Sequence, residues 1–195
     1  MSLTVEKCLQ AWTNSFKQMG TIADVVFFGD SLTFYGDFSQ VFPGKVVCNL
    51  GLRGDTIEGM IDRVEQVKIL SPKAVFLMAG INNVSLFGGD AFGDIYDSLL
   101  TKMRIELHDT TVFIQTLLPV NDRDFSISCN NEQIVSCNAS IKRVANKNNM
   151  ASIDLFSLFE QDGYLPKAKT FDGIHLYEKS YLSWYNRLKK YNNFI

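Results

Sequence analysis

Apolar residues are concentrated in five short runs along the chain. In most of these runs they follow one another directly instead of alternating with polar residues, and the fifth run is the weakest. Continuous runs of this length are typical of strands that are buried on both faces of a sheet. The pattern therefore predicts five buried strands, at Val25–Phe28, Val46–Leu50, Ala74–Ala79, Thr111–Leu118 and Ala151–Leu155.

The segments before, between and after these runs carry apolar residues every three or four positions. In one of them, Ile57, Met60, Ile61 and Val64 fall on a single stripe. This spacing is typical of amphipathic helices that turn one face toward a core. It predicts helices at Val5–Met19, Thr56–Leu70, Ala91–Leu107, Asn131–Lys147 and Glu178–Tyr191.

Predicted strands and helices alternate along the chain, and the longest irregular stretch is 119–130. Such alternation is typical of an α/β fold with a parallel sheet and helices on both faces. Five strands suit the flavodoxin-like order 2-1-3-4-5. We therefore expect a three-layer α/β/α sandwich that forms a single domain over residues 1–195, a common domain length.

Composition narrows the class of protein further. The formal net charge is −2 and no basic block stands out, which argues against a nucleic-acid partner. The longest apolar run, Ala74–Ile81, is far shorter than the roughly 20 residues of a membrane span. The first residues do not resemble a signal peptide, so we expect a cytoplasmic protein, with a trimmed leader left open.

The cysteines are Cys8, Cys48, Cys129 and Cys137, and none of them forms a C-x-x-C pair. With only two histidines in the chain, this pattern predicts no structural zinc site. We also expect no cofactor. Cys48 lies in an apolar run and is interpreted as a buried core thiol. No disulfide pairing follows from the spacing of the others.

Polar and glycine residues follow several of the predicted strands. In an open parallel sheet, ligands bind beyond the carboxyl ends of the strands. We therefore expect four segments to meet at one edge of the sheet. They are Gly29-Asp30-Ser31-Leu32 after the first strand, 49–55 after the second, Gly80-Ile81-Asn82-Asn83 after the third, and Asp172-Gly173-Ile174-His175 downstream of the fifth.

These segments contain the groups that ester hydrolysis requires. Such a reaction needs an activated hydroxyl, a base, a group that orients the base, and donors for the oxyanion. Ser31 offers a hydroxyl at a strand-to-helix turn, and Asp172 lies close enough to His175 to accept from its Nδ1–H. Gly54 offers a backbone N–H without a side chain, and Asn82 offers an amide donor.

The same four segments resemble the four blocks of the GDSL, or SGNH, hydrolase family, in the family's order. The resemblance implies an SGNH hydrolase fold with Ser31 as nucleophile, His175 as base and Asp172 as the orienting acid. It implies an oxyanion hole formed by the Ser31 amide, the Gly54 amide and the Asn82 side chain. Without it, Gly51 and Gly54 fit a turn equally well. The segments 49–56 and 117–121 are similar to the acetylhydrolase-like branch, which includes platelet-activating-factor acetylhydrolase and bacterial acetylesterases.

One position departs from the family pattern. The third block usually reads Gly-x-Asn-Asp, whereas here Asn83 stands in place of the acid. The oxyanion donor Asn82 is kept, so the departure concerns support of the nearby loops. We expect it to lower activity without abolishing it, and we expect Asn83→Asp to be tolerated or activating.

Other residues near these blocks receive structural interpretations. Asp30 is expected to hold the Ser31 turn by accepting backbone N–H bonds. His108 is expected to interact with the last carbonyls of a helix. Asp55 is interpreted as the cap of the helix that starts at Thr56, rather than as part of an Arg-Gly-Asp adhesion motif. Tyr181 and Trp184 are expected to pack in the core.

Four aromatic residues lie just beyond the catalytic turns: Phe34, Tyr35, Phe38 and Phe87. Two roles are open for them, because they either line a substrate pocket for the acyl group or pack its rim. The chain shows no obvious lid insertion, which favours an open site and short acyl groups such as acetyl.

The sequence therefore predicts a serine esterase that acts on a small-molecule ester of a sugar, lipid or small alcohol. A degenerate, non-catalytic binding member of the same fold is the alternative, but every triad residue is present. A phospho-receiver domain would need an Asp after the third strand, where Asn82-Asn83 stand. A flavodoxin would need a phosphate loop rich in Ser, Thr and Gly after the first strand. Acyl transfer to an acceptor other than water stays open, as does the oligomeric state.

Overall fold

A computed structural model describes residues 22–195. Five parallel strands form one sheet in the order β2-β1-β3-β4-β5, which confirms the predicted α/β architecture. The predicted helix at Val5–Met19 lies outside the described residues. The strands are β1 Val25–Gly29, β2 Val47–Gly51, β3 Ala74–Met78, β4 Thr111–Gln115 and β5 Ala151–Ile153.

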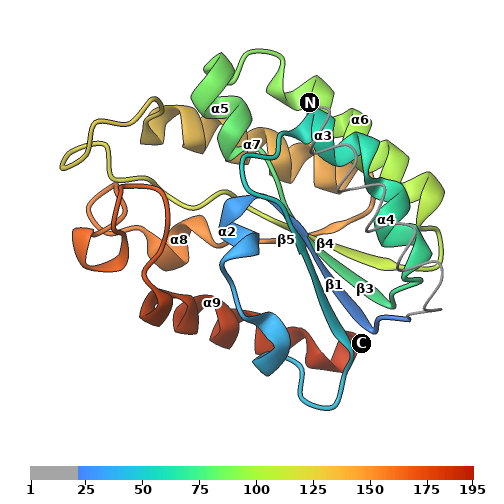
Figure 1. The fold of residues 1–195 in the computed structure, drawn as a ribbon. Coiled ribbons are helices and arrows are strands. Elements are labelled where there is room, and N and C mark those ends of the chain that lie inside the picture. The colour runs from blue at the N-terminus through green and yellow to red at the C-terminus, as the bar shows by residue number, and fades with distance from the viewer. Residues whose placement is uncertain (1–21) are drawn as a thin grey trace.

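Helices cover both faces of the sheet, with α3, α4, α6 and α7 on one side and α9 on the other (Figure 1). Among the described residues, no helix has the length and apolar character needed to cross a membrane. The α-helices are α2 Ser31–Phe34, α3 Ile57–Asp62, α4 Val64–Ile69, α5 Ile81–Phe87, α6 Phe92–Glu106, α7 Asn131–Lys147, α8 Phe156–Phe159 and α9 Tyr181–Leu188. Short 3-10 helices lie at Phe38–Gln40, Lys167–Lys169, Glu178–Ser180 and Lys189–Phe194.

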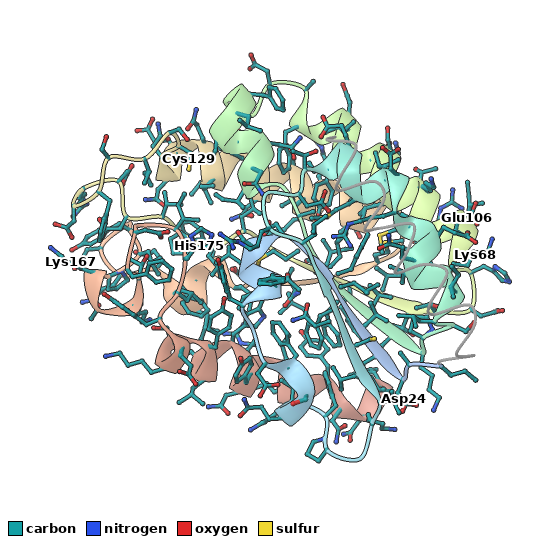
Figure 2. The ribbon with its side chains drawn as sticks, viewed as in Figure 1. Asp24, Lys68, Glu106, Cys129, Lys167 and His175 are labelled. Atoms are coloured by element: carbon teal, nitrogen blue, oxygen red, sulfur yellow. The ribbon has the colours of Figure 1, made fainter. Side chains whose placement is uncertain are left out.

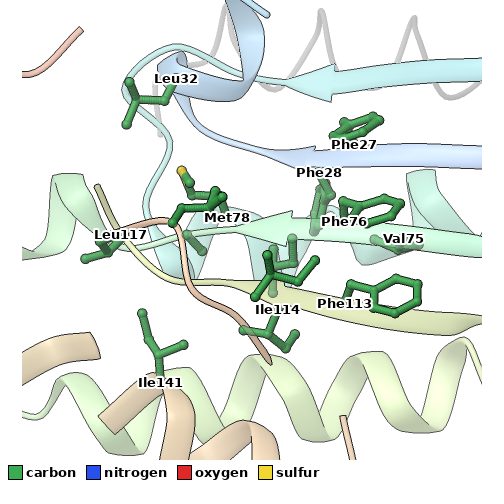
Figure 3. Close-up of a cluster of buried hydrophobic side chains, with 14 of the residues drawn as sticks. Phe27, Phe28, Leu32, Val75, Phe76, Met78, Phe113, Ile114, Leu117 and Ile141 are labelled. Carbon is green, nitrogen blue, oxygen red and sulfur yellow. The ribbon is translucent and has the colours of Figure 1, made fainter. Parts of the chain in front are cut away.

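Three phenylalanines on the central strands form the middle of the core. Phe27 of β1 is paired in register with Phe76 of β3, and Phe76 with Phe113 of β4. Their ring centroids lie 5.1 and 4.9 Å apart along this row, and Figure 3 shows all three side chains across the sheet. Because stacked aromatics contribute beyond their buried area, this row fixes the register of the strands that carry the site.

Three predicted elements differ from the structure. The fourth strand ends at Gln115 because the next amide but one, that of Leu117, donates to the Asn138 side chain instead of to a strand. The predicted helix Thr56–Leu70 is two helices that break at Arg63, whose side chain turns inward. The predicted helix Glu178–Tyr191 is regular only over α9, with 3-10 turns on either side.

Cys48 is half-buried on β2 rather than buried in the core. The reason is that β2 is an edge strand of the sheet within residues 22–195, so no described strand covers one of its sides. The other two cysteines of the described region, Cys129 and Cys137, are buried and free. Tyr181 and Trp184 are buried as predicted.

Candidate active site

Ser31 is held at the turn between β1 and α2. The Asp30 carboxylate accepts from the Leu32 amide at 2.9 Å, which confirms the structural role predicted for Asp30. From the opposite side, the Tyr181 hydroxyl of α9 donates to the Leu32 carbonyl at 2.8 Å. The turn is therefore fixed both by its own Asp30 and by Tyr181, which is far away in the sequence. Ser31 is the first residue of α2.

The Ser31, His175 and Asp172 side chains form a continuous hydrogen-bonded chain. The Ser31 Oγ lies 2.8 Å from His175 Nε2, and His175 Nδ1 lies 2.6 Å from Asp172 Oδ2. The other Asp172 oxygen accepts from the backbone amides of His175 at 2.8 Å and Ile174 at 3.0 Å. These bonds fix both the carboxylate and the imidazole plane before any ligand is bound.

The protonation of this chain follows from Asp172. Burial opposes ionisation of Asp172, but the bonds from the His175 ring and from the His175 and Ile174 amides together lower its pKa. An ionised carboxylate can only accept hydrogen bonds. His175 Nδ1 therefore carries a hydrogen and donates a hydrogen bond to Asp172. The Nε2 atom is then free to accept from the Ser31 hydroxyl.

The loop that carries Asp172 and His175 is anchored at both sides. Thr170 Oγ1 donates to the His175 carbonyl at 2.7 Å and accepts from the Gly173 amide at 2.9 Å. Gly173 has φ +94°, and a Cβ there would lie 3.0 Å from both the Asn121 carbonyl and Phe125. Glycine is needed at this position both for the backbone angle and for the close approach of 121–125.

Ser31 and His175 open into a cleft of about 510 Å³ at the carboxyl ends of the strands. Figure 2 shows His175 beside α2 at this end of the sheet. The cleft brings the two residues together with Gly54 and Asn82, which carry the other two predicted oxyanion donors besides the Ser31 amide. Its lining residues are Ser31, Tyr35, Arg53, Gly54, Ile81, Asn82, Ser85, Ile174 and His175.

The predicted donors are oriented by the surrounding backbone. Asn82 Nδ2 donates to the Asp55 carbonyl at 2.7 Å, which uses one of its two N–H groups and fixes the amide plane. Gly54 has φ +73°, but a Cβ there would meet nothing within 4 Å. The positive φ favours glycine at position 54, and the close approach of a ligand to its backbone N–H stays a prediction.

The predicted pocket aromatics occupy different places. Tyr35 lines the cleft, and its ring meets the His175 ring edge to face at 5.6 Å. Phe34 packs against Tyr35 and is 49% exposed, while Phe87 on α5 is 59% exposed, and neither lines the cleft. Phe38 is buried in the core, where its ring stacks on Phe27 at 3.9 Å.

Arg63 is a buried residue behind the site that sequence reasoning missed. Its guanidinium donates to Asp55 at 2.7 Å, to the Leu50 carbonyl at 2.7 Å and to the Gly29 carbonyl at 2.9 Å. It thereby joins the ends of β1 and β2 to the loop of Gly54. No sequence pattern marks it, because a lone arginine in a helical stripe is usually at the surface.

Two structural interpretations need correction. Thr56 caps α3 by accepting from the Gly59 amide, whereas Asp55 is buried in its ion pair with Arg63. Burial raises the pKa of Asp55 against the opposing effect of the Arg63 charge. His108 is exposed, and its Nε2 atom lies 3.1 Å from Asp109 Oδ2 instead of interacting with helix carbonyls.

Within residues 22–195, no three His, Cys, Asp or Glu side chains gather in a group that could hold a metal ion.

Comparisons with known proteins agree with this fold. A model of the GDSL-like lipase/acylhydrolase family matches residues 27–181. A Streptococcus pneumonia structure named for platelet activating factor has 20% identity and TM-score 0.79 over 97% of this chain and 96% of that one. A GDSL-like lipase from Bacteroides thetaiotaomicron has 20% identity and TM-score 0.76 over 95% and 97%.

A variant of an acetyl xylan esterase from Geobacillus stearothermophilus has 18% identity and TM-score 0.70, over 90% of this chain and 96% of that one. At such identities these structures establish a shared fold. Among curated proteins, none matches the sequence.

Proposed function

The chain belongs to the GDSL-like lipase/acylhydrolase family and is a carboxylic ester hydrolase, and on this premise we propose that Ser31 is its nucleophile. The observation that carries the proposal is the continuous chain from Ser31 Oγ through His175 to Asp172, with distances of 2.8 and 2.6 Å. A serine hydroxyl is weakly nucleophilic unless a neighbouring base takes its proton.

In the first half of the reaction, Ser31 Oγ attacks the ester carbonyl while its proton passes to His175 Nε2. The imidazolium that forms lies against the ionised Asp172, which stabilises its charge. His175 then returns the proton to the leaving alcohol as the C–O bond breaks. In the second half, a water oxygen attacks the acyl carbon while its proton passes to His175 Nε2. His175 then returns that proton to Ser31 Oγ as the bond between Oγ and the acyl carbon breaks and the acid leaves.

The oxyanion of each tetrahedral intermediate is held by the Ser31 amide, the Gly54 amide and the second N–H of Asn82. Neither backbone amide donates to another described residue, so both are available to a ligand. The Asn82 amide is already fixed by the Asp55 carbonyl, so little reorganisation is needed when the charge develops.

The substrate we propose is a small-molecule ester with a short acyl group, such as acetyl, on a sugar, lipid or small alcohol. Support comes from the cleft, whose volume of about 510 Å³ is in the range of small-ligand sites. It comes also from the similar structure that is named as an acetyl xylan esterase.

The test is a series of p-nitrophenyl esters from acetate to long-chain acids, run on the wild-type chain and on Ser31→Ala. We expect the highest kcat/KM on the shortest esters and loss of all turnover above background in Ser31→Ala. A maximum at long chains would overturn the proposed acyl group, and Ser31-independent turnover would overturn the proposed nucleophile.

A further inference from the structure

Asn83, the residue that departs from the family pattern, contacts the first turn of α3 and does not line the cleft. It is buried, with 4% of its surface exposed. Its Oδ1 accepts from the Ile57 amide at 2.8 Å, and its Nδ2 donates to Glu58 Oε2 at 2.8 Å. Both halves of the side-chain amide are therefore used.

We propose that Asn83 and Glu58 form a positioning pair that fixes the oxyanion donors, and that Glu58 makes an amide at position 83 necessary. The proposal rests on the proposed function, because it matters for catalysis only if Gly54 and Asn82 hold the oxyanion. Neither Asn83 nor Glu58 touches the reacting atoms.

The pair lies between the two segments that supply donors. Asn82 and Asn83 are neighbours in the first turn of α5, and Gly54 precedes the start of α3. Asn82 bonds to the Asp55 carbonyl, and Asn83 bonds to the first two residues of α3. Three hydrogen bonds thus join two short segments. Loss of the two Asn83 bonds would leave the Asn82 bond as the remaining side-chain hydrogen bond between them among the described residues.

The charge of Glu58 determines which side chain of the pair donates the hydrogen bond and which accepts it. Burial opposes its ionisation, but the Asn83 amide, the Glu58 backbone amide and the Thr56 hydroxyl lower the pKa of Glu58. An ionised Glu58 can only accept, so its partner has to donate. An aspartate at 83 would still accept from Ile57, but its second oxygen would face the Glu58 carboxylate. The proposal therefore predicts the opposite of the expectation that Asn83→Asp is tolerated or activating.

The test is a cycle of Asn83→Asp, Glu58→Gln and the double variant, in which the donor and acceptor of the pair exchange places. For Asn83→Asp we expect kcat on p-nitrophenyl acetate to fall about 10-fold with KM within about twofold, because the oxyanion forms only after binding. Glu58→Gln keeps an acceptor and should lower kcat less than about threefold. The double variant should recover to within about threefold of wild type. Glu65→Gln on α4 is the matched control for removal of an exposed glutamate charge.

Wild-type kcat in Asn83→Asp, or no recovery in the double variant, would overturn the proposal. Urea unfolding of the same proteins supplies a readout that does not depend on activity. There the destabilisation of Asn83→Asp should be relieved by Glu58→Gln, and strictly additive effects would also overturn the pair. If the wild type lacked Ser31-dependent activity, the proposed function would fail while the unfolding cycle still decided the pairing.

Discussion

The two carboxyl oxygens of the buried residue Asp30 differ in their hydrogen bonding. Its Oδ1 accepts from the Leu32 amide, whereas its Oδ2 is buried and has no partner among the described residues. Burial raises the pKa of Asp30 from 3.8 to about 7, despite the opposing effect of the Leu32 amide. Burial therefore places the pKa of the group beside the proposed nucleophile near neutral pH.

This shift predicts a pH-dependent stability that Asp30→Asn removes. Between pH 3.8 and about 7 the folded protein keeps a proton that the unfolded chain has released, so the free energy of unfolding falls as pH rises through that window. A shift of this size corresponds to about 4 kcal/mol. The side-chain amide that Asp30→Asn introduces keeps an acceptor for the Leu32 amide and does not titrate.

The measurement is urea unfolding of both proteins at about pH 5 and about pH 8. Asp30→Asn should gain stability relative to wild type at the higher pH. An unchanged difference between the two proteins at both pH values would contradict the assignment of this proton to Asp30.

Asn82 is the oxyanion donor whose contribution can be removed by a side-chain change. Asn82→Ala should lower kcat by about 10²- to 10³-fold, as the loss of one such donor does elsewhere. Ser85→Ala is a suitable control, because Ser85 lines the same cleft with no proposed role. Equal kcat values for Asn82→Ala and wild type would contradict the role of Asn82.

At the scale of elements, the structure shows which sequence signals were sufficient. The helix Asn131–Lys147, predicted from its apolar spacing, is correct to the residue, and in the structure Asn130 and Gln133 form a reciprocal capping box at its start. The helix predicted at Thr56–Leu70 is broken because Arg63 bonds to the ends of two strands. Those partners come together only in the folded sheet, so periodicity within the segment could not reveal them.

The Arg63–Asp55 pair gives a prediction for this break between α3 and α4. Arg63→Leu leaves Asp55 buried without its partner, and should cost about 3–5 kcal/mol of unfolding free energy. Adding Asp55→Asn removes the uncompensated charge and should restore part of the loss, measured by urea unfolding. If the second change destabilised the protein further by its full single-variant effect, the pairing would not explain the cost.

At the scale of the whole molecule, the sheet order accounts for how the site could be anticipated. The strand order places the ends of β1 and β2 side by side, with β3 next to β1. The segments containing Ser31, Gly54 and Asn82 therefore face one cleft. The family blocks marked these residues and drew attention to Asn83, whereas the supporting contacts of Arg63 and Tyr181 depend on packing between distant segments and carry no local signal.

The central claim is that Ser31 forms a covalent acyl-enzyme. Its most direct test is intact-mass analysis after treatment with a fluorophosphonate probe, followed by mapping of the modified peptide. We expect one adduct, on Ser31, in the wild type and in Ser85→Ala, and none in Ser31→Ala. Labelling of Ser31→Ala at the wild-type rate, or an adduct mapped to another residue, would contradict the account.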